Sequence, residues 1–377
     1  MSLSGRSLHA PERQIVWDGL GLDSSHSGIG YYGKCLHEAL CELGEIPIIT
    51  ALVGTPAIIN RENVLFVPHE NAATPTSIRK RSADKIYGLK PVFPSLSYKV
   101  AARNYPAMIY HGLSNLNLPC FVKKRANDRF VVTIHDLIPL MAGGPSALSV
   151  QMRVLMPRVV HLADAIIVPS IWTKNSLVEQ FGESLCNKIN VIPNGTTDIR
   201  EEFSENPPKE KTNDVLAVGR GEGYKRIHLI ADLAKASPRT RFILVTDEFG
   251  ARCVGSPPTN LKVLVKISRQ QLVEAYSTSR IFLHPSLYEG WCLPAADAIK
   301  AGLFTIFVKG TGIEEVCAYA PGASFGLDAG AGLNQWQEAL FGALADKANR
   351  TAKEVKSNLP TWRENAEKTL KIYQSLL

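Results

Sequence analysis

The stretch Ser286-Leu-Tyr-Glu-Gly-Trp-Cys-Leu-Pro-Ala-Ala-Asp-Ala-Ile-Lys-Ala-Gly302 holds two carboxylates eight positions apart, Glu289 and Asp297. Glu289 falls in a turn, and the apolar pattern after it predicts a helix that carries Asp297 and ends at Gly302. The backbone N–H groups at the start of such a helix carry partial positive charge, which suits a diphosphate. Nearby carboxylates can accept hydrogen bonds from sugar hydroxyls. The stretch therefore predicts a nucleotide-sugar pocket, the alternative being a solvated surface loop.

Around this stretch, apolar runs typical of strands alternate with amphipathic helical stretches, and the rhythm restarts after Asn194-Gly195 and a polar loop over 204–214. Such alternation predicts an α/β protein with parallel sheets flanked by helices. The chain has 377 residues, more than the roughly 250 to 300 at which a single core stops growing, so we expect two Rossmann-like domains with a cleft between them. The expected strands cover residues 14–17, 46–52, 64–67, 108–110, 129–134, 165–168, 215–218, 242–246, 262–265, 281–284 and 305–308, and the expected helices include 32–43, 227–235, 269–277 and 361–377.

The composition is that of an ordinary globular protein, with 45% hydrophobic and 20% charged residues. No apolar run approaches the roughly 18 residues of a membrane span, and the first residues lack the apolar core of a secretory signal, so we expect a cytoplasmic protein. The seven cysteines are scattered without Cys-x-x-Cys spacing. We interpret them as buried thiols, neither disulfides nor zinc ligands.

The net charge of +7 is concentrated in the N-terminal half of the chain. Two basic clusters, Arg79-Lys80-Arg81 and Lys123-Lys124-Arg125, could touch an anionic membrane or an acidic glycan, although such runs are more often solvated faces. Peripheral contact with the inner face of the membrane through this half therefore stays open. Nucleic acid is not expected as a partner, because the basic residues are not interleaved with aromatic ones and no binding motif is present.

The pair Glu289 and Asp297 resembles the Glu-x7-Glu motif of retaining glycosyltransferases of the GT-B fold, in particular glycosyltransferase family 4 (group 1). Asp297 is one methylene shorter than the usual Glu, and Cys292 stands where a smaller residue is usual. The resemblance implies two Rossmann-like domains that face each other across a cleft, with a C-terminal helix that crosses back to the first domain. Residues 1–195 would bind the acceptor, residues 196–360 would bind the nucleotide-sugar donor, and residues 361–377 would form the returning helix.

The segment Val218-Gly219-Arg220-Gly-Glu-Gly-Tyr-Lys225-Arg226 resembles the Gly-Arg loop with a following Lys that holds the donor diphosphate in this family. A guanidinium grips phosphate oxygens in a fork, and a nearby ammonium adds a point charge. The resemblance leaves open whether Lys225 or Arg226 reaches the phosphate. A solvated basic loop is the alternative.

His135 and Asp136 follow a strong β run, at the strand end where open α/β sheets place their ligands. They resemble the His-Asp element of family 4 enzymes, in which the histidine lies beside the donor sugar. The alternatives are a hydrogen-bonded core histidine and a helix-capping aspartate. His111 in Tyr110-His111-Gly112 lies at another expected strand end and is a second candidate.

Gly28-Ile-Gly30-Tyr-Tyr-Gly33 is a Gly-x-Gly-x-x-Gly sequence before an expected helix, which can indicate a dinucleotide site. The second strand ends near Thr50 without the acidic residue that such a site needs for the ribose. We instead expect a glycine loop whose amides approach the donor phosphates, as the similar loop does in the family. A turn that requires positive φ is the alternative.

The resemblance implies further donor contacts from the motif loop and from the segment between the domains. The loop over 309–315 resembles the family's closing loop near the base and the ribose. The implied donor-binding residues are Gly28, Gly30, Asp136, Asn194, Gly219, Arg226, Gly290, Trp291, Cys292, Leu293 and Asp297, and His135, Arg220, Lys225 and Glu289 are the implied catalytic residues.

Sugar transfer builds positive charge at the anomeric carbon and negative charge on the departing diphosphate. Arg220, Lys225 and the helix start would stabilise the diphosphate, and Glu289 would orient the sugar. The resemblance implies retention of configuration, with the leaving phosphate taking the proton of the acceptor. We expect no metal and no cofactor, because the chain has no Asp-x-Asp motif and its basic groups can replace a cation.

The expected function is therefore transfer of a hexose from a GDP- or UDP-linked sugar to a glycan, lipid-linked or small-molecule acceptor. Mannose is the first expectation, from the resemblance of Thr-Ile-His-Asp-Leu-Ile-Pro to polysaccharide-assembling transferases. Two alternatives stay open: a non-catalytic GT-B protein that binds nucleotide or glycan, and a sugar-nucleotide epimerase. Release of nucleoside diphosphate that depends on an acceptor distinguishes the transferase from both.

Overall fold

The computed structural model describes residues 13–20, 22, 28–51, 63–66, 92–142, 146–203, 211, 213–345 and 358–377. The chain divides into two compact units. Unit 1 comprises residues 1–168, 174–192 and 362–377, and unit 2 comprises residues 169–173 and 193–361. The cluster Arg79-Lys80-Arg81 and most of the loop 204–214 lie outside the described residues.

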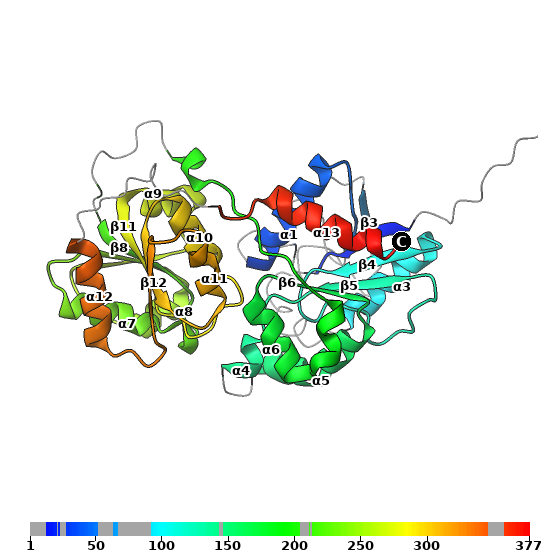
Figure 1. Ribbon diagram of the computed structural model, residues 1–377, viewed down its shortest axis with the longest axis horizontal. Coiled ribbons are helices and arrows are strands. Elements are labelled where there is room, and N and C mark those ends of the chain that lie inside the picture. Colours follow the sequence, from blue (N-terminus) through cyan, green and yellow to red (C-terminus); the bar gives the residue numbers. More distant parts are fainter. Residues whose placement is uncertain are drawn as a thin grey trace, which may run out of the picture. The chain divides into compact units, whose positions relative to one another are not determined.

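Unit 1 is built on a seven-stranded sheet in which all neighbouring strands are parallel, in the order β3-β2-β1-β4-β5-β6-β7 (Figure 1). The direction of winding reverses between β1 and β4, as in doubly wound folds. The strands are β1 (Gln14–Asp18), β2 (Ile48–Ala51), β3 (Val64–Phe66), β4 (Met108–Gly112), β5 (Arg129–Thr133), β6 (Ala165–Val168) and β7 (Ile189–Val191). The helices are α1 (Gly28–Glu42), α3 (Phe93–Asn104), α4 (Ile138–Met141), α5 (Ala147–Leu162), α6 (Ile171–Phe181), whose first residues belong to unit 2, the 3-10 turn η2 (Glu183–Lys188) and α13 (Trp362–Ser375).

Unit 2 repeats this plan with a six-stranded parallel sheet in the order β10-β9-β8-β11-β12-β13, so its winding reverses between β8 and β11. The strands are β8 (Asn213–Val218), β9 (Phe242–Thr246), β10 (Leu261–Val265), β11 (Ser279–His284), β12 (Phe304–Val308) and β13 (Ser324–Leu327). The helices are α7 (Ile227–Ala236), α8 (Glu248–Val254), α9 (Arg269–Thr278), α10 (Leu293–Lys300), α11 (Gly312–Ala318) and α12 (Leu333–Ala345), with 3-10 turns η3 (Ile199–Glu202) and η4 (Gly223–Lys225).

Helices cover both faces of the unit 2 sheet, which explains why the central strands carry apolar side chains on both faces. Successive side chains of a strand point to opposite faces. In β8, Val215 and Ala217 enter a core with α7 and α12, whereas Leu216 and Val218 contribute to a core with α9, α10 and α11. The strands expected from the sequence are confirmed. Their apolar residues are explained by the cores that lie on both faces of the sheet.

The C-terminal helix α13 belongs to unit 1 and packs beside α1 (Figure 1). Trp362, Ala366 and Tyr373 are buried at helical spacing, which confirms the expected amphipathic helix. None of the described helices combines the length and the apolar character needed to cross a membrane.

A buried polar network ties α13 to the sheet of unit 1. The Tyr373 hydroxyl accepts a hydrogen bond from Trp17 Nε1 at 3.0 Å and lies 2.6 Å from His111 Nδ1. His111 Nε2 in turn lies 2.9 Å from Thr133 Oγ1. Burial and, to a smaller degree, the neighbouring His135 lower the pKa of His111 to about 3, so the ring is neutral. The second candidate histidine is therefore part of the core.

Two expectations from the sequence are wrong. The glycine loop does not precede a helix, because Gly28 and Gly30 lie inside α1, which begins at Gly28. A Cβ at Gly33 would lie 2.2 Å from Leu22 Cδ2, so this glycine lets the helix pack closely on the chain before it. None of the seven cysteines forms a disulfide, but Cys186 and Cys253 are exposed and Cys41 is only partly buried, so not all of them are the buried thiols expected.

Tyr373→Phe should destabilise unit 1 by about 1–3 kcal/mol, because Trp17 Nε1 and His111 Nδ1 would lose their buried partner. Urea unfolding of the full chain measures the change. Tyr105→Phe is the control, since the Tyr105 side chain is only partly buried. Equal stability of the two variants would contradict the role of the network.

The pKa of His111 also predicts how stability depends on pH. Unfolding restores an ordinary pKa near 6.5, so between about pH 6.5 and 3 the unfolded chain binds one more proton than the folded chain. Between pH 6.5 and 3, His111 alone should lower the free energy of unfolding by about 1.4 kcal/mol for each pH unit of acidification. His111→Gln should therefore lose less stability than the wild type between pH 7 and 5.

Exposed His228→Gln is the control for this prediction, and it should keep the wild-type slope. Comparison of variants at equal pH is needed because buried Asp18 acts in the opposite direction. Burial raises the pKa of Asp18 to about 6, so its contribution to stability grows as the pH falls toward 4. Identical slopes for wild type and His111→Gln would contradict the prediction.

Candidate functional site

The candidate residues of unit 2 gather at the carboxyl ends of its two central strands. The loop after β8 carries Gly219, Arg220 and Lys225, and the loop after β11 carries Glu289. These strands are neighbours, and the winding of the sheet reverses between them. Ligands of open α/β sheets bind at such a position, because the connections leave in opposite directions and open a crevice.

Glu289 is the centre of this group, with only 6% of its surface exposed. Its Oε1 accepts hydrogen bonds from Lys225 Nζ at 2.6 Å and from His284 Nε2 at 2.5 Å. Burial by itself would raise the pKa of Glu289, but the charges of Lys225 and His284, together with their hydrogen bonds, outweigh it and lower the pKa to about 2. Glu289 is therefore an ionised carboxylate held inside the protein.

Backbone hydrogen bonds hold the Glu289 loop on both sides. Leu287 N donates to Tyr224 O at 2.8 Å, which joins this loop to the one that carries Lys225. Gly312 N donates to Glu289 O at 2.8 Å, and a Cβ at Gly312 would lie 2.2 Å from Gly290 O. Gly312 begins α11, so residues 312–315 of the expected 309–315 loop are helical, and only glycine at this position lets the start of the helix lie against the Glu289 loop.

Lys225 and Arg226 are adjacent in sequence but face different surroundings. Burial by itself would lower the pKa of Lys225, but the charge of Glu289, the neighbouring Tyr224 and Cys292 and the hydrogen bond to Glu289 together outweigh it, so the pKa lies above the ordinary value and the ammonium stays charged. Arg226 has positive φ and donates from Nε to Pro285 O at 2.7 Å and from Nη1 to Ala329 O at 3.0 Å. Lys225 is therefore the cation beside Glu289, and Arg226 links the loops behind it.

Arg220 is the exposed member of the group. Its side chain is 69% exposed and forms an ion pair with Glu222 at 3.0 Å. The loop around it is held by Asp247, whose Oδ1 accepts hydrogen bonds from Gly221 N and Gly250 N. The guanidinium thus lies at the surface on an anchored loop.

Asp297 lies on the second turn of α10, where it is mostly buried. Arg269 Nη1 lies 3.8 Å from its Oδ2, and the same guanidinium holds Glu202. Burial raises the pKa of Asp297 to about 7, against the lowering effect of Arg269. The second acid of the motif is therefore close to its protonation midpoint at neutral pH.

The other predicted residues of the motif loop are mostly buried. Trp291 and Cys292 are buried, and Trp291 Nε1 has no hydrogen-bond partner among the described residues. Leu293 begins α10 and is partly buried against the core, and Gly290 lies against Gly312. Asn194, in the segment before unit 2's sheet, is also buried.

His284, Glu289 and Cys292 bring three possible metal-ligand atoms within 4.8 Å of one another. Two of these atoms, His284 Nε2 and Glu289 Oε1, are already hydrogen-bonded at 2.5 Å, and the Lys225 ammonium contacts the same oxygen. A metal ion at Oε1 would have to break the hydrogen bond between His284 and Glu289 and displace the Lys225 ammonium. The arrangement observed is a hydrogen-bonded carboxylate.

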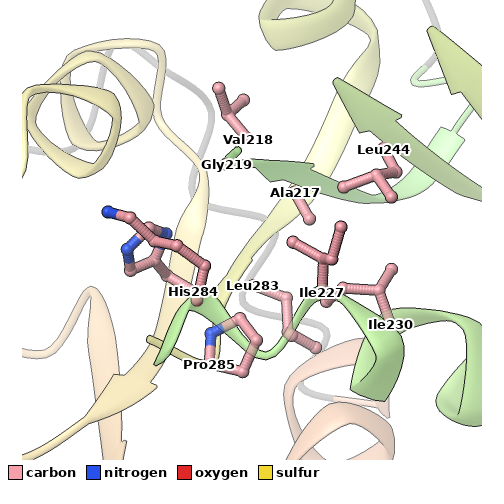
Figure 2. A pocket seen from close by; sticks show the side chains of 10 residues that line it. Ala217, Val218, Gly219, Ile227, Ile230, Leu244, Leu283, His284 and Pro285 are labelled. Carbon is pink, nitrogen blue, oxygen red and sulfur yellow. The ribbon is translucent and has the colours of Figure 1, made fainter. Parts of the chain in front are cut away.

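A cavity of about 10 Å³ lies beside this cluster, between the ends of β8 and β11 (Figure 2). Ala217, Ile227 and Leu283 give it an apolar lining, and Lys225 and His284 also line it. It has room for about one water molecule. It is therefore a packing gap and not itself a nucleotide-sugar pocket.

In unit 1, His135 and Asp136 lie at the end of β5, and each has a local structural role. His135 Nε2 donates to Leu113 O at 2.9 Å, and its ring meets that of Tyr32 edge-on, with centroids 5.0 Å apart. Burial lowers the pKa of His135. Asp136 Oδ1 accepts from Ile138 N at 3.0 Å, at the start of α4. Tyr32 comes from α1, the helix that Gly28 and Gly30 begin.

Sequence reasoning missed His284. The residue is the last of β11, and the rule that ligands lie at the carboxyl ends of strands, applied to His135, would have selected it as well.

Two family models match adjoining parts of the chain. Residues 198–321 match the model described as glycosyl transferases group 1, and residues 59–198 match the model described as glycosyltransferase family 4. A curated relative is the gpi3 subunit of phosphatidylinositol N-acetylglucosaminyltransferase of Schizosaccharomyces pombe, 22% identical over 304 residues. That alignment covers 74% of this chain and 62% of the relative, so the chain spans about three fifths of the relative's length.

Solved structures share the fold over nearly the whole chain. Sucrose-phosphate synthase from Thermosynechococcus elongatus has a TM-score of 0.69 at 18% identity, covering 97% of this chain and 96% of that one. The catalytic domain of starch synthase IV from Arabidopsis thaliana, bound to ADP and acarbose, has a TM-score of 0.68 at 14% identity, covering 97% and 99%. Anabaena HepE in complex with UDP and glucose has a TM-score of 0.67 at 15% identity, covering 96% and 100%.

These matches run from one doubly wound unit into the other, and the chain therefore belongs to the group 1, family 4 glycosyltransferases of the GT-B fold.

Proposed function

We propose that this glycosyltransferase is retaining and metal-independent, and that it moves a hexose or an N-acetylhexosamine from a nucleoside-diphosphate sugar to a glycan or lipid-linked acceptor. The observation that carries the proposal is the ionised carboxylate of Glu289, held by Lys225 at the carboxyl ends of β8 and β11. A buried carboxylate that accepts sugar hydroxyls and an ammonium beside it that attracts phosphate fit a nucleotide sugar.

The leaving diphosphate would be stabilised by Lys225, by Arg220 on its anchored loop and by the start of α10. Glu289 would orient the sugar, and Asp297 would contact the ribose or the sugar. His135 of unit 1 would lie beside the donor sugar, as the family resemblance implies. The leaving phosphate would take the acceptor's proton, so configuration is retained without an enzymatic nucleophile.

Lys225 also supports the metal-independent part of the proposal. Its ammonium already neutralises Glu289, and fixed positive groups can stabilise a leaving diphosphate in place of a cation. For the donor, a nucleotide-linked N-acetylglucosamine is suggested by the name of the S. pombe relative, and GDP-mannose by the resemblance of the His-Asp segment. These two are the donors to test first.

Glu289→Gln should keep the thermal stabilisation by the bare nucleoside diphosphate but lose the extra stabilisation by its sugar conjugate. Charge-assisted hydrogen bonds to the sugar contribute about 1.5–3 kcal/mol, so affinity for the sugar part should fall about 10- to 100-fold. A thermal-shift panel of UDP, GDP, ADP and their sugar conjugates measures this, since a ligand at about 100 times its Kd stabilises the folded state by about 2.7 kcal/mol.

Exposed Glu248→Gln, also in unit 2, is the control and should behave like the wild type. No shift with any nucleotide in the wild type would contradict the proposed function. Acceptor-dependent release of nucleoside diphosphate then separates the transferase from a binding protein, and conversion of the donor without an acceptor would indicate an epimerase.

One surface of unit 1 favours an acceptor presented at a membrane. Helix α5 has no acidic residue, carries Arg153 and Arg158, and exposes Leu148 by 47%, Val150 by 51% and Val154 by 69%. Exposed apolar side chains beside basic ones are typical of helices that lie on anionic bilayers. The basic cluster Lys123-Lys124-Arg125 supports membrane contact less, because Lys124 and Arg125 form ion pairs with aspartates of unit 1.

Val150→Asp with Val154→Asp should reduce binding to vesicles that contain an anionic phospholipid by about tenfold or more, because apolar area would no longer be buried and negative charge is added. Vesicle co-sedimentation measures the change, with pure phosphatidylcholine vesicles for comparison. Ile46→Asp is the control, because Ile46 is a similarly exposed apolar residue elsewhere on unit 1. Equal binding by wild type and double variant would refute membrane contact through α5.

A further inference from the structure

His284 occupies a fixed position next to the predicted sugar-orienting acid. It ends β11, whose pairing with β8 and β12 sets its backbone, and it is 4% exposed. Its ring stacks on Phe282 with centroids 5.6 Å apart and an interplanar angle of 15°. Nε2 lies 2.5 Å from Glu289 Oε1 and 3.7 Å from Cys292 Sγ. A hydrogen bond to a carboxylate requires the hydrogen on Nε2, so the ring is the donor.

The two oxygens of Glu289 are used differently. Every hydrogen bond that the carboxylate accepts from the described residues ends on Oε1, from Lys225 and from His284. Oε2 accepts none of them, and it is not among the buried polar atoms without a partner, so it keeps some exposed surface. One oxygen is therefore held by the protein, and the other is available to a ligand.

Lys225 has two competing tasks if the proposed function is correct. It neutralises Glu289 in the present structure, and it would also stabilise the departing diphosphate. An ammonium has three hydrogens and one charge, so its attraction to Glu289 weakens as phosphate oxygens approach. A buried carboxylate that loses its partner is costly to keep ionised. A second donor on the same oxygen removes this conflict.

We propose that His284 is a positioning residue for sugar transfer: its Nε2–H holds Oε1 of Glu289 so that Oε2 faces the donor sugar, and it keeps this hold when Lys225 turns to the diphosphate. The inference rests on the proposed function. It assigns to His284 an effect on the sugar part of the donor and not on the nucleotide part.

The test compares His284→Gln with His284→Asn in the full chain. The amide of Gln can place its N–H near the position of Nε2, whereas the amide of Asn is too short to reach Glu289. Both replacements are polar and uncharged, so they differ mainly in this hydrogen bond. Parallel titrations with the bare nucleotide and with its sugar conjugate measure how much affinity the sugar adds. In His284→Asn this added affinity should fall about tenfold or more, while the affinity for the bare nucleotide should stay unchanged. His284→Gln should recover most of the loss.

The outcomes separate the inference from the function on which it rests. The inference is overturned if the affinity that the sugar adds is unchanged in His284→Asn. It is also overturned if both variants lose affinity equally for the nucleotide and for its sugar conjugate, because that pattern indicates a purely structural histidine. Exposed His228→Asn should match the wild type. Failure of the wild type to bind any nucleotide would overturn the proposed function and this inference with it, and it is seen before any variant is made.

Discussion

The contact of Lys225 and His284 with one oxygen of Glu289 is the interaction on which the site in unit 2 depends. An ionised carboxylate is expensive to bury unless its charge is matched and its hydrogen bonds are satisfied. Three chain segments must therefore meet: the loop after β8, the last residue of β11 and the loop before α10. The backbone bonds Leu287 N to Tyr224 O and Gly312 N to Glu289 O hold these segments in place.

The two units use the strand next to the reversal of their sheet in different ways. His111 of β4 and His284 of β11 each lie in the strand next to the reversal of their sheet. In unit 1, α13 brings Tyr373 onto His111, and burial keeps that ring neutral in a closed network. In unit 2, the ring of His284 meets a carboxylate instead. The same topology thus supports a packed core in one unit and a candidate site in the other, because different segments cover the strand end.

Arg226 shows the difference between neighbours in sequence and neighbours in space. Lys225 and Arg226 are both basic and adjacent, so either could reach a phosphate from the sequence alone. The positive φ of Arg226 turns its side chain toward the carbonyls of Pro285 and Ala329, where it links loops. Backbone conformation at one residue therefore separates two cations that the sequence leaves equivalent. Similarly, the glycines of Gly28-Ile-Gly30 are helical because a helix is decided by tertiary packing as well as by propensity.

The sequence by itself determined the α/β class, most strands and the position of the Glu289 motif, because strands covered on both faces must be continuous apolar runs and parallel strands require crossovers. It also determined the amphipathic C-terminal helix, through the spacing of Trp362, Ala366 and Tyr373. Only the tertiary structure decided that His284 holds Glu289, that His111 is buried and that Arg226 binds the carbonyls of Pro285 and Ala329. Those outcomes depend on contacts between residues far apart in the chain, or on a single backbone angle, and a local pattern of residues contains neither.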